Sequence, residues 1–256
     1  CARLAEILGN NEAAARCNAL THESAAAWKK ACFDPETGKV ETGSQTEQLL
    51  ALGFGVVPEE ARSKTFERML EAVNGAENSP ALSTGIFGTR FLLEELSKGG
   101  RSDLAHTLAV RKTFPSWGWM LENGATTLWE DWQGTDNVKS HNHPMFGSIS
   151  GWLHRWLGGI QIADDAVGAD RLVIAPQVVD GLTHVKCTHR TIRGTVVSNW
   201  TKSGSKTDFE IVIPPDTTAL IRLPLKENDK LTESGKPIHD RKIELGSGSY
   251  RFRIAK

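Results

Sequence analysis

Residues 144–159, PMFGSISGWLHRWLGG, mark the point where the character of the chain changes from helix to strand. Pro144 is a favoured first-turn residue, and Gly158 and Gly159 are typical helix stops. The residues before this stretch have helical patterns, whereas those after Gly168 have strand patterns. One face of the helix between these signals is apolar, formed by Met145, Ile149, Trp152, Leu153, Trp156 and Leu157.

The chain upstream of Pro144 predicts five further helices joined by short links. The second begins with a capping box, in which Ser44 is the N-cap and Glu47 follows three residues later. Residues 113–143 are too polar and too rich in turn formers for a helix. Short links place successive helices antiparallel, so residues 1–160 are expected to form an all-α layer. The five helices are expected at residues 10–32, 44–52, 58–73, 86–97 and 102–112.

The chain after Gly168 is built from short β-branched or alternating runs separated by Gly, Pro, Asp and Ser. This texture is typical of an antiparallel β-sandwich. The boundary between the two parts falls within residues 159–168, which gives domains at residues 1–160 and 161–256. Strands are expected at residues 172–174, 184–188, 194–200, 209–213, 218–223 and 249–254.

The composition excludes several classes of function. The 256 residues contain 30 Lys and Arg against 31 Asp and Glu, so the formal charge of −1 gives no electrostatic case for nucleic acid or an anionic membrane. No apolar run approaches the roughly 20 residues that a membrane helix needs. The four cysteines form no CxxC pair, which argues against a zinc or disulfide framework. Localisation is not indicated.

Tryptophan use is unusual. The chain has 8 Trp and one Tyr, and six of the tryptophans lie between residues 117 and 156. An indole offers a flat apolar face and an N–H donor, which suits a sugar ring with C–H bonds on one side and hydroxyls at its edge. Core packing is the alternative explanation of the cluster.

The stretch TTLWEDW, residues 126–132, places a carboxylate among these tryptophans. If the stretch is a strand, alternation puts Glu130 on the same face as Trp132 and on the opposite face from Trp129. Glycoside hydrolysis needs a carboxylate that activates water and a surface that holds the sugar. A salt-bridging surface role for Glu130 is the alternative.

A pair of histidines, His141 and His143, lies just before the helix at Pro144. Two histidines can bind a metal, but no third ligand stands near them in the sequence, so we expect no metal and no cofactor. His143 suits either a hydrogen bond to a sugar hydroxyl or a capping role ahead of Pro144, which Asn142 also suits.

Four long motifs together resemble one family. They are LSTGIFGTRFLLEELSKGGRSDLA (82–105), TFPSWGWMLENGATTLWEDW (113–132), HNHPMFGSISGWLHRWLGGI (141–160), and APQVVDGLTHVKCTHRTIRGTVVSNW (175–200) with IPPDTTALIRLP (213–224). In this order and spacing they resemble the C-terminal half of bacterial-type alpha-L-rhamnosidases, which are similar to glycoside hydrolase family 78. The resemblance covers nearly the whole chain.

This resemblance implies part of an (α/α)₆ barrel followed by a β-sandwich, and an inverting mechanism on terminal alpha-L-rhamnose. It implies that Glu130, in the TTxWE motif, is the general base and that His143 binds the rhamnose. Trp132, Trp117 and Trp129 are the implied pocket tryptophans. The chain departs from the family pattern at Asp131 and Gln133, which flank Trp132 and change the charge beside the base.

The predicted helices are too few for a barrel of six helix pairs, and the family's general acid lies upstream. An inverting site needs an acid about 6.5–9.5 Å from its base. We therefore expect the chain to be the distal part of a longer or split enzyme, inactive alone, whose partners are the missing N-terminal half and a rhamnose-containing glycoside. If the chain is active alone, its acid is expected among Glu122, Asp131 and Glu47. The alternatives are a rhamnose-binding module that does not cleave and a metal enzyme using His141 and His143.

Overall fold

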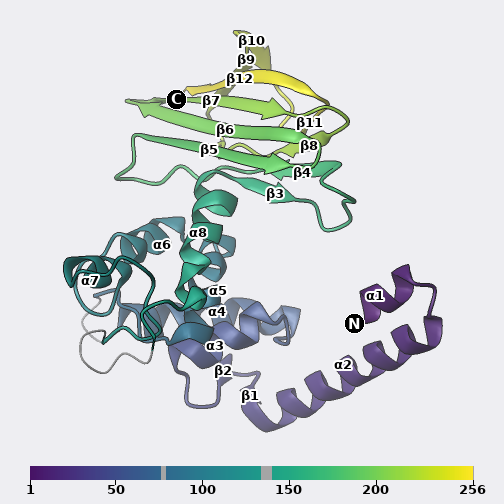
Figure 1. Cartoon of the computed structure of the whole chain (residues 1–256), viewed down its shortest axis with the longest axis vertical. Coiled ribbons are helices and arrows are strands. Elements are labelled where there is room, and N and C mark those ends of the chain that lie inside the picture. Colours follow the sequence, from purple (N-terminus) through teal and green to yellow (C-terminus); the bar gives the residue numbers. More distant parts are fainter. Residues whose placement is uncertain (76–78, 134–139, 256) are drawn as a thin grey trace.

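The computed structural model describes residues 1–75, 79–133 and 140–255. Figure 1 shows a helical part, which holds the first core, and a two-sheet part stacked on one end of it. A helical part followed by a part built of mostly antiparallel sheets is the arrangement that the sequence predicted. No helix in the described ranges is long and apolar enough to cross a membrane.

The helical part contains the predicted helices and two that the sequence did not predict. Ser44 caps α3 and forms the expected capping box with Glu47. A short α7 lies within the stretch predicted to be irregular, where the Ser116 side chain caps its first turn. The helices are α1 (Ala2–Ile7), α2 (Asn11–Cys32), α3 (Gln45–Gly53), α4 (Glu59–Asn74), α5 (Ile86–Lys98), α6 (Ser102–Ala109) and α7 (Trp117–Glu122).

The helix predicted from Pro144 is present but changes its winding. It begins as a 3₁₀ turn, Pro144–Gly147, continues as α8 (Ser148–Trp152) and ends as a π turn, Leu153–Leu157. Each change of winding rotates the residues that follow. As a result Phe146 is fully buried, whereas Leu153, predicted for the apolar face, is 43% exposed.

Helices α1 and α2 are the least buried helices of the helical part, and none of the residues of α1 is buried. Of the 22 residues of α2, only Ala14 is buried. Figure 1 shows α2 running along the edge of the molecule and α1 turning back beside it. Helices α3, α6 and α8 pack against α5, and α4 packs against α3.

The sheet part contains all six predicted strands and four more. A six-stranded sheet has the order β10-β9-β12-β7-β6-β5, and a four-stranded sheet has the order β11-β8-β4-β3. Every pair is antiparallel except β4 with β8, which run parallel. The strands are β3 (Ile160–Ile162), β4 (Arg171–Ile174), β5 (His184–Thr191), β6 (Gly194–Ser203), β7 (Lys206–Ile213), β8 (Thr218–Ile221), β9 (Lys230–Glu233), β10 (Lys236–Ile238), β11 (Ile243–Leu245) and β12 (Gly248–Ala255); β1 (Phe33–Asp34) and β2 (Lys39–Val40) form a separate hairpin.

The two parts meet where the π turn enters the sheets. The Trp200 indole N–H of β6 donates to the Leu157 carbonyl at 2.9 Å. Gly158 touches the Cys187 side chain so closely that a Cβ there would lie 2.3 Å from its sulfur. Val179, in the sheet part, belongs to the helical core. The helical end is therefore packed firmly onto the sandwich.

Candidate active site

Glu130 lies on an extended segment that is not a regular strand. Two hydrogen bonds join it to the segment before Pro144: the Glu130 N–H donates to the Ser140 carbonyl, and the His143 N–H donates to the Leu128 carbonyl, each at 2.9 Å. The strand expected at residues 126–132 is therefore absent, but the chain there pairs with residues 140–143. This pairing brings Glu130 and His143 onto neighbouring segments.

The Glu130 side chain is half-buried, and within the described ranges its carboxylate has no hydrogen-bond or ion-pair partner. The described residues therefore do not show Glu130 as a salt-bridging surface residue. A carboxylate with no protein partner retains its acceptor positions for water or a ligand.

His143 lies at the start of the 3₁₀ turn in the capping position that the sequence suggested. Its Nδ1 accepts a hydrogen bond from the Met145 N–H at 3.4 Å. Because Nδ1 is an acceptor, the proton of a neutral His143 ring is on Nε2, which can donate to a ligand. Capping and ligand binding are therefore compatible, since they use different nitrogens.

His141 is exposed, with its ring 5.5 Å from that of Trp129. No group of three or more His, Cys, Asp or Glu suited to a metal occurs among the residues that the structure describes. The expected absence of a metal therefore stays a prediction.

Trp132 and Trp117 are packed into the helical core beside this segment. The Trp132 ring stacks on Phe146 at 3.9 Å and meets Trp117 edge-on at 5.3 Å. Both indole N–H groups donate to backbone carbonyls, that of Trp132 to Thr84 at 2.7 Å and that of Trp117 to Phe146 at 2.9 Å.

All three nominated tryptophans are at least nine-tenths buried. Trp117 and Trp129 are 6% exposed and Trp132 is 7% exposed. The alternation was expected only if the segment formed a strand, which it does not; Trp129 and Trp132 both belong to the helical core. Their contact with a sugar stays a prediction, but little ring surface is free for it.

The three carboxylates named as possible acids have other partners. Glu122 pairs with Lys112 at 3.1 Å, and Asp131 accepts from the Gln133 N–H. Burial raises the pKa of Glu47, but hydrogen bonds from Thr42 and the Ser44 N–H outweigh it, so the pKa of Glu47 lies below its ordinary value. A general acid requires a raised pKa, which makes Glu47 unsuitable.

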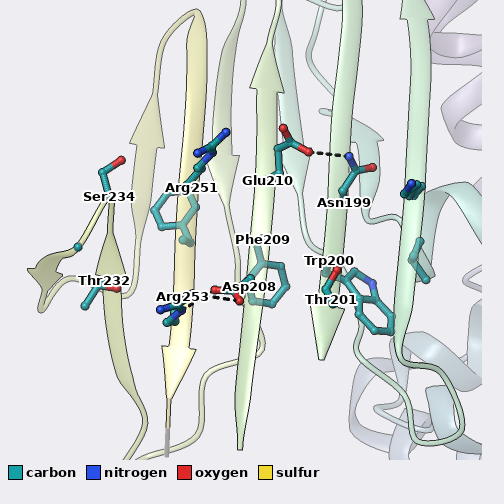
Figure 2. A pocket seen from close by; sticks show the side chains of 14 residues that line it. Asn199, Trp200, Thr201, Asp208, Phe209, Glu210, Thr232, Ser234, Arg251 and Arg253 are labelled. Carbon is teal, nitrogen blue, oxygen red and sulfur yellow. Dashed lines mark hydrogen bonds and ion pairs between the residues drawn. The ribbon is translucent and has the colours of Figure 1, made fainter. Parts of the chain in front are cut away.

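A hollow with a volume of about 500 Å³, separate from the Glu130 segment, lies on the outer face of the six-stranded sheet. Figure 2 shows two pairs of side chains that meet across neighbouring strands here, Arg253 with Asp208 and Asn199 with Glu210. Arg253 donates to Asp208 at 2.6 Å, and Asn199 donates to Glu210 at 2.9 Å. Asp208 and Glu210 are thus held by these contacts, and the hollow does not include the segments of Glu130 and His143.

Comparison with known proteins identifies the family. Residues 1–157 match the bacterial alpha-L-rhamnosidase 6 hairpin glycosidase domain, and residues 159–237 match the bacterial alpha-L-rhamnosidase C-terminal domain. The chain belongs to the bacterial alpha-L-rhamnosidase family. An alpha-L-rhamnosidase of Formosa agariphila is 36% identical over 240 residues, which are 90% of this chain and 25% of that protein.

Solved alpha-L-rhamnosidase structures share this fold. The enzyme of Dictyoglumus thermophilum has a TM-score of 0.91 at 28% identity, over 100% of this chain and 30% of that one. The Streptomyces avermitilis alpha-L-rhamnosidase, solved in complex with L-rhamnose, has a TM-score of 0.86 at 29% identity, over 98% of this chain and 25% of that one. The chain thus spans about a quarter of the length of the curated alpha-L-rhamnosidases that it matches.

Sequence reasoning missed two residues that shape this candidate site, Thr84 and Phe146. Thr84 contributes a backbone carbonyl, which any residue would supply, so its identity gave no signal. Phe146 is one position away from the predicted apolar stripe, and the 3₁₀ turn brings it into the core.

Proposed function

We propose that this chain is the distal part of an inverting alpha-L-rhamnosidase, divided at residue 160 into a barrel segment and a sandwich, with Glu130 as the general base. The observation that carries the proposal is the Glu130 carboxylate, which has no partner among the described residues and lies on a segment paired with that of His143. Family membership supports the substrate class, because the curated relatives are named alpha-L-rhamnosidases.

The chemistry uses one carboxylate of this chain and one acid supplied from upstream. The Glu130 carboxylate takes a proton from a water molecule, and that water attacks the anomeric carbon opposite the leaving oxygen. The upstream acid protonates the leaving oxygen as the glycosidic bond breaks. His143 donates from Nε2 to a rhamnose hydroxyl, since its Nδ1 is used by the backbone.

The test is the substitution Glu130→Gln, assayed by hydrolysis of p-nitrophenyl alpha-L-rhamnoside with the full-length enzyme and with this chain alone. Removing the base should lower kcat by about 10²–10⁴-fold while rhamnose still binds. Glu122→Gln, which changes an exposed carboxylate paired with Lys112, is the matched control and should retain activity.

Two outcomes would contradict the proposal. If Glu130→Gln retains full activity, another group is the base. If the wild-type enzyme binds L-rhamnose but never cleaves the substrate, the chain belongs to a binding module. Proton NMR of the first product separates inversion from retention, because inversion releases beta-L-rhamnose first.

A further inference from the structure

We propose that Trp132 is a positioning residue, whose indole fixes the segments of Glu130 and His143 on the helical frame. The inference rests on the proposed function of Glu130 and His143. It differs from the sequence expectation, in which Trp132 contacts the sugar.

The Trp132 side chain joins its own segment to two other segments of the chain. Trp132 follows Glu130 by two residues, and its N–H donates to the carbonyl of Thr84, directly before the N-cap of α5. Its ring stacks at 3.9 Å on Phe146, three residues after His143. One side chain thus connects the base segment, the start of α5 and the histidine segment.

Trp117 closes this arrangement from the other side. It meets Trp132 edge-on, with an interplanar angle of 88°, and its N–H donates to the Phe146 carbonyl. Phe146 is therefore held by its ring through Trp132 and by its backbone through Trp117, and it is fully buried. Closely packed aromatic rings with satisfied N–H groups have few alternative arrangements.

The same contacts leave Trp132 poorly suited to hold a sugar. Phe146 covers one face of its ring, the Trp117 ring packs against it, and its N–H is already bonded. A ligand would have to displace a core contact to reach the ring. Positioning is therefore the role that a 7% exposed indole can fill.

The chain offers a matched control for the loss of one buried indole hydrogen bond. The Trp152 N–H of α8 donates to the Ser97 hydroxyl at 2.8 Å, and Trp152 is fully buried in the same core. Trp132→Phe and Trp152→Phe each keep an aromatic ring and lose one N–H. Only the first loses a bond that anchors the Glu130 segment.

The experiment measures amide hydrogen exchange at Glu130 and His143, whose N–H groups bond to Ser140 and Leu128, together with urea unfolding. Trp132→Phe should speed exchange at both amides by about fivefold or more, the equivalent of one buried hydrogen bond. Trp152→Phe should lower the free energy of unfolding by a similar amount. Exchange at the Glu130 and His143 amides should then rise no more than exchange at amides that open only by global unfolding. Equal acceleration in the two variants, or none in Trp132→Phe, would overturn the proposal.

An activity measurement separates positioning from substrate contact. In the full-length enzyme, Trp132→Phe should lower kcat about tenfold with little change in KM, because a misplaced base affects the transition state. A rise in KM at unchanged kcat would instead identify a binding contact and overturn the inference. If the wild-type enzyme shows no hydrolysis, the proposed function fails, whereas the exchange experiment still decides the positioning.

Discussion

Buried polar side chains decide how the loops around α3 are held. Gln48 is fully buried and accepts from the Val40 N–H at 2.8 Å while donating to the Gly38 carbonyl. Gln45 donates to the Ala72 and Ala81 carbonyls and so ties α4 to the segment before α5. Each amide satisfies buried backbone groups that would otherwise lack partners. The partners of Gln45 are distant in the chain, so no local sequence pattern signals this role.

His106 should make stability depend on pH. Burial lowers the pKa of His106, whose ring lies against Gly181 at the junction of the two parts. The unfolded chain therefore binds a proton at His106 more readily than the folded chain does. The free energy of unfolding is unaffected by this group above about pH 6.5 and decreases as the pH falls below it.

The measurement for His106 is urea unfolding between pH 5.5 and pH 8. His106→Gln should flatten the loss of stability at low pH by a few tenths of a kcal/mol, a small effect because the half-buried ring is partly screened by water. His22→Gln, in an exposed position on α2, is the control. Parallel curves for wild type and His106→Gln would contradict the prediction.

At the scale of elements, α1 and α2 should be the first part of the chain to open. Only Ala14 of α2 is buried, and none of α1 is. Helices without tertiary packing are marginally stable in water. Amides in residues 2–32 should therefore exchange at least about tenfold faster than those of α5, as measured by hydrogen exchange with mass spectrometry.

Limited proteolysis gives an independent check of this order. The earliest cuts should lie within α1 or α2 and leave the remaining core intact. Protection of α2 equal to that of α5, with first cuts elsewhere, would show that α2 is held more firmly than its burial indicates.

At the scale of the molecule, an apolar groove of about 680 Å³ runs between α2 and α3. Leu20 and Phe54 line it and are 61% and 67% exposed. Soluble monomers rarely leave apolar surface of this kind uncovered. The chain by itself should therefore self-associate as its concentration rises.

Sedimentation velocity over a range of concentrations measures this association. Phe54→Ser should weaken it by about tenfold, because it removes an exposed aromatic surface from the groove. Ile192→Ser changes an 87% exposed residue of the β5–β6 turn and should have no effect. Monomers at all concentrations, or equal effects of both substitutions, would contradict the prediction.

Features that depend on neighbouring residues could be predicted from the amino-acid sequence. The capping box at Ser44, the helix stops at Gly158 and Gly159, and the alternation of β6 are set by contacts within a few positions. The family motifs also indicated the family of the chain, because their order and spacing can be read directly from the sequence. Glu130 and His143 were predicted as site residues in this way, and their roles stay predictions.

Features that join distant parts of the chain could be seen only in the folded molecule. The parallel pairing of β4 with β8 depends on the whole sheet, and the irregular winding after Pro144 depends on the core that Phe146 enters. The Trp132 bond to Thr84 spans 48 residues and has no local signal. A tryptophan suits a sugar site and a core equally well by chemistry, so its surroundings alone reveal which role its ring is placed to fill.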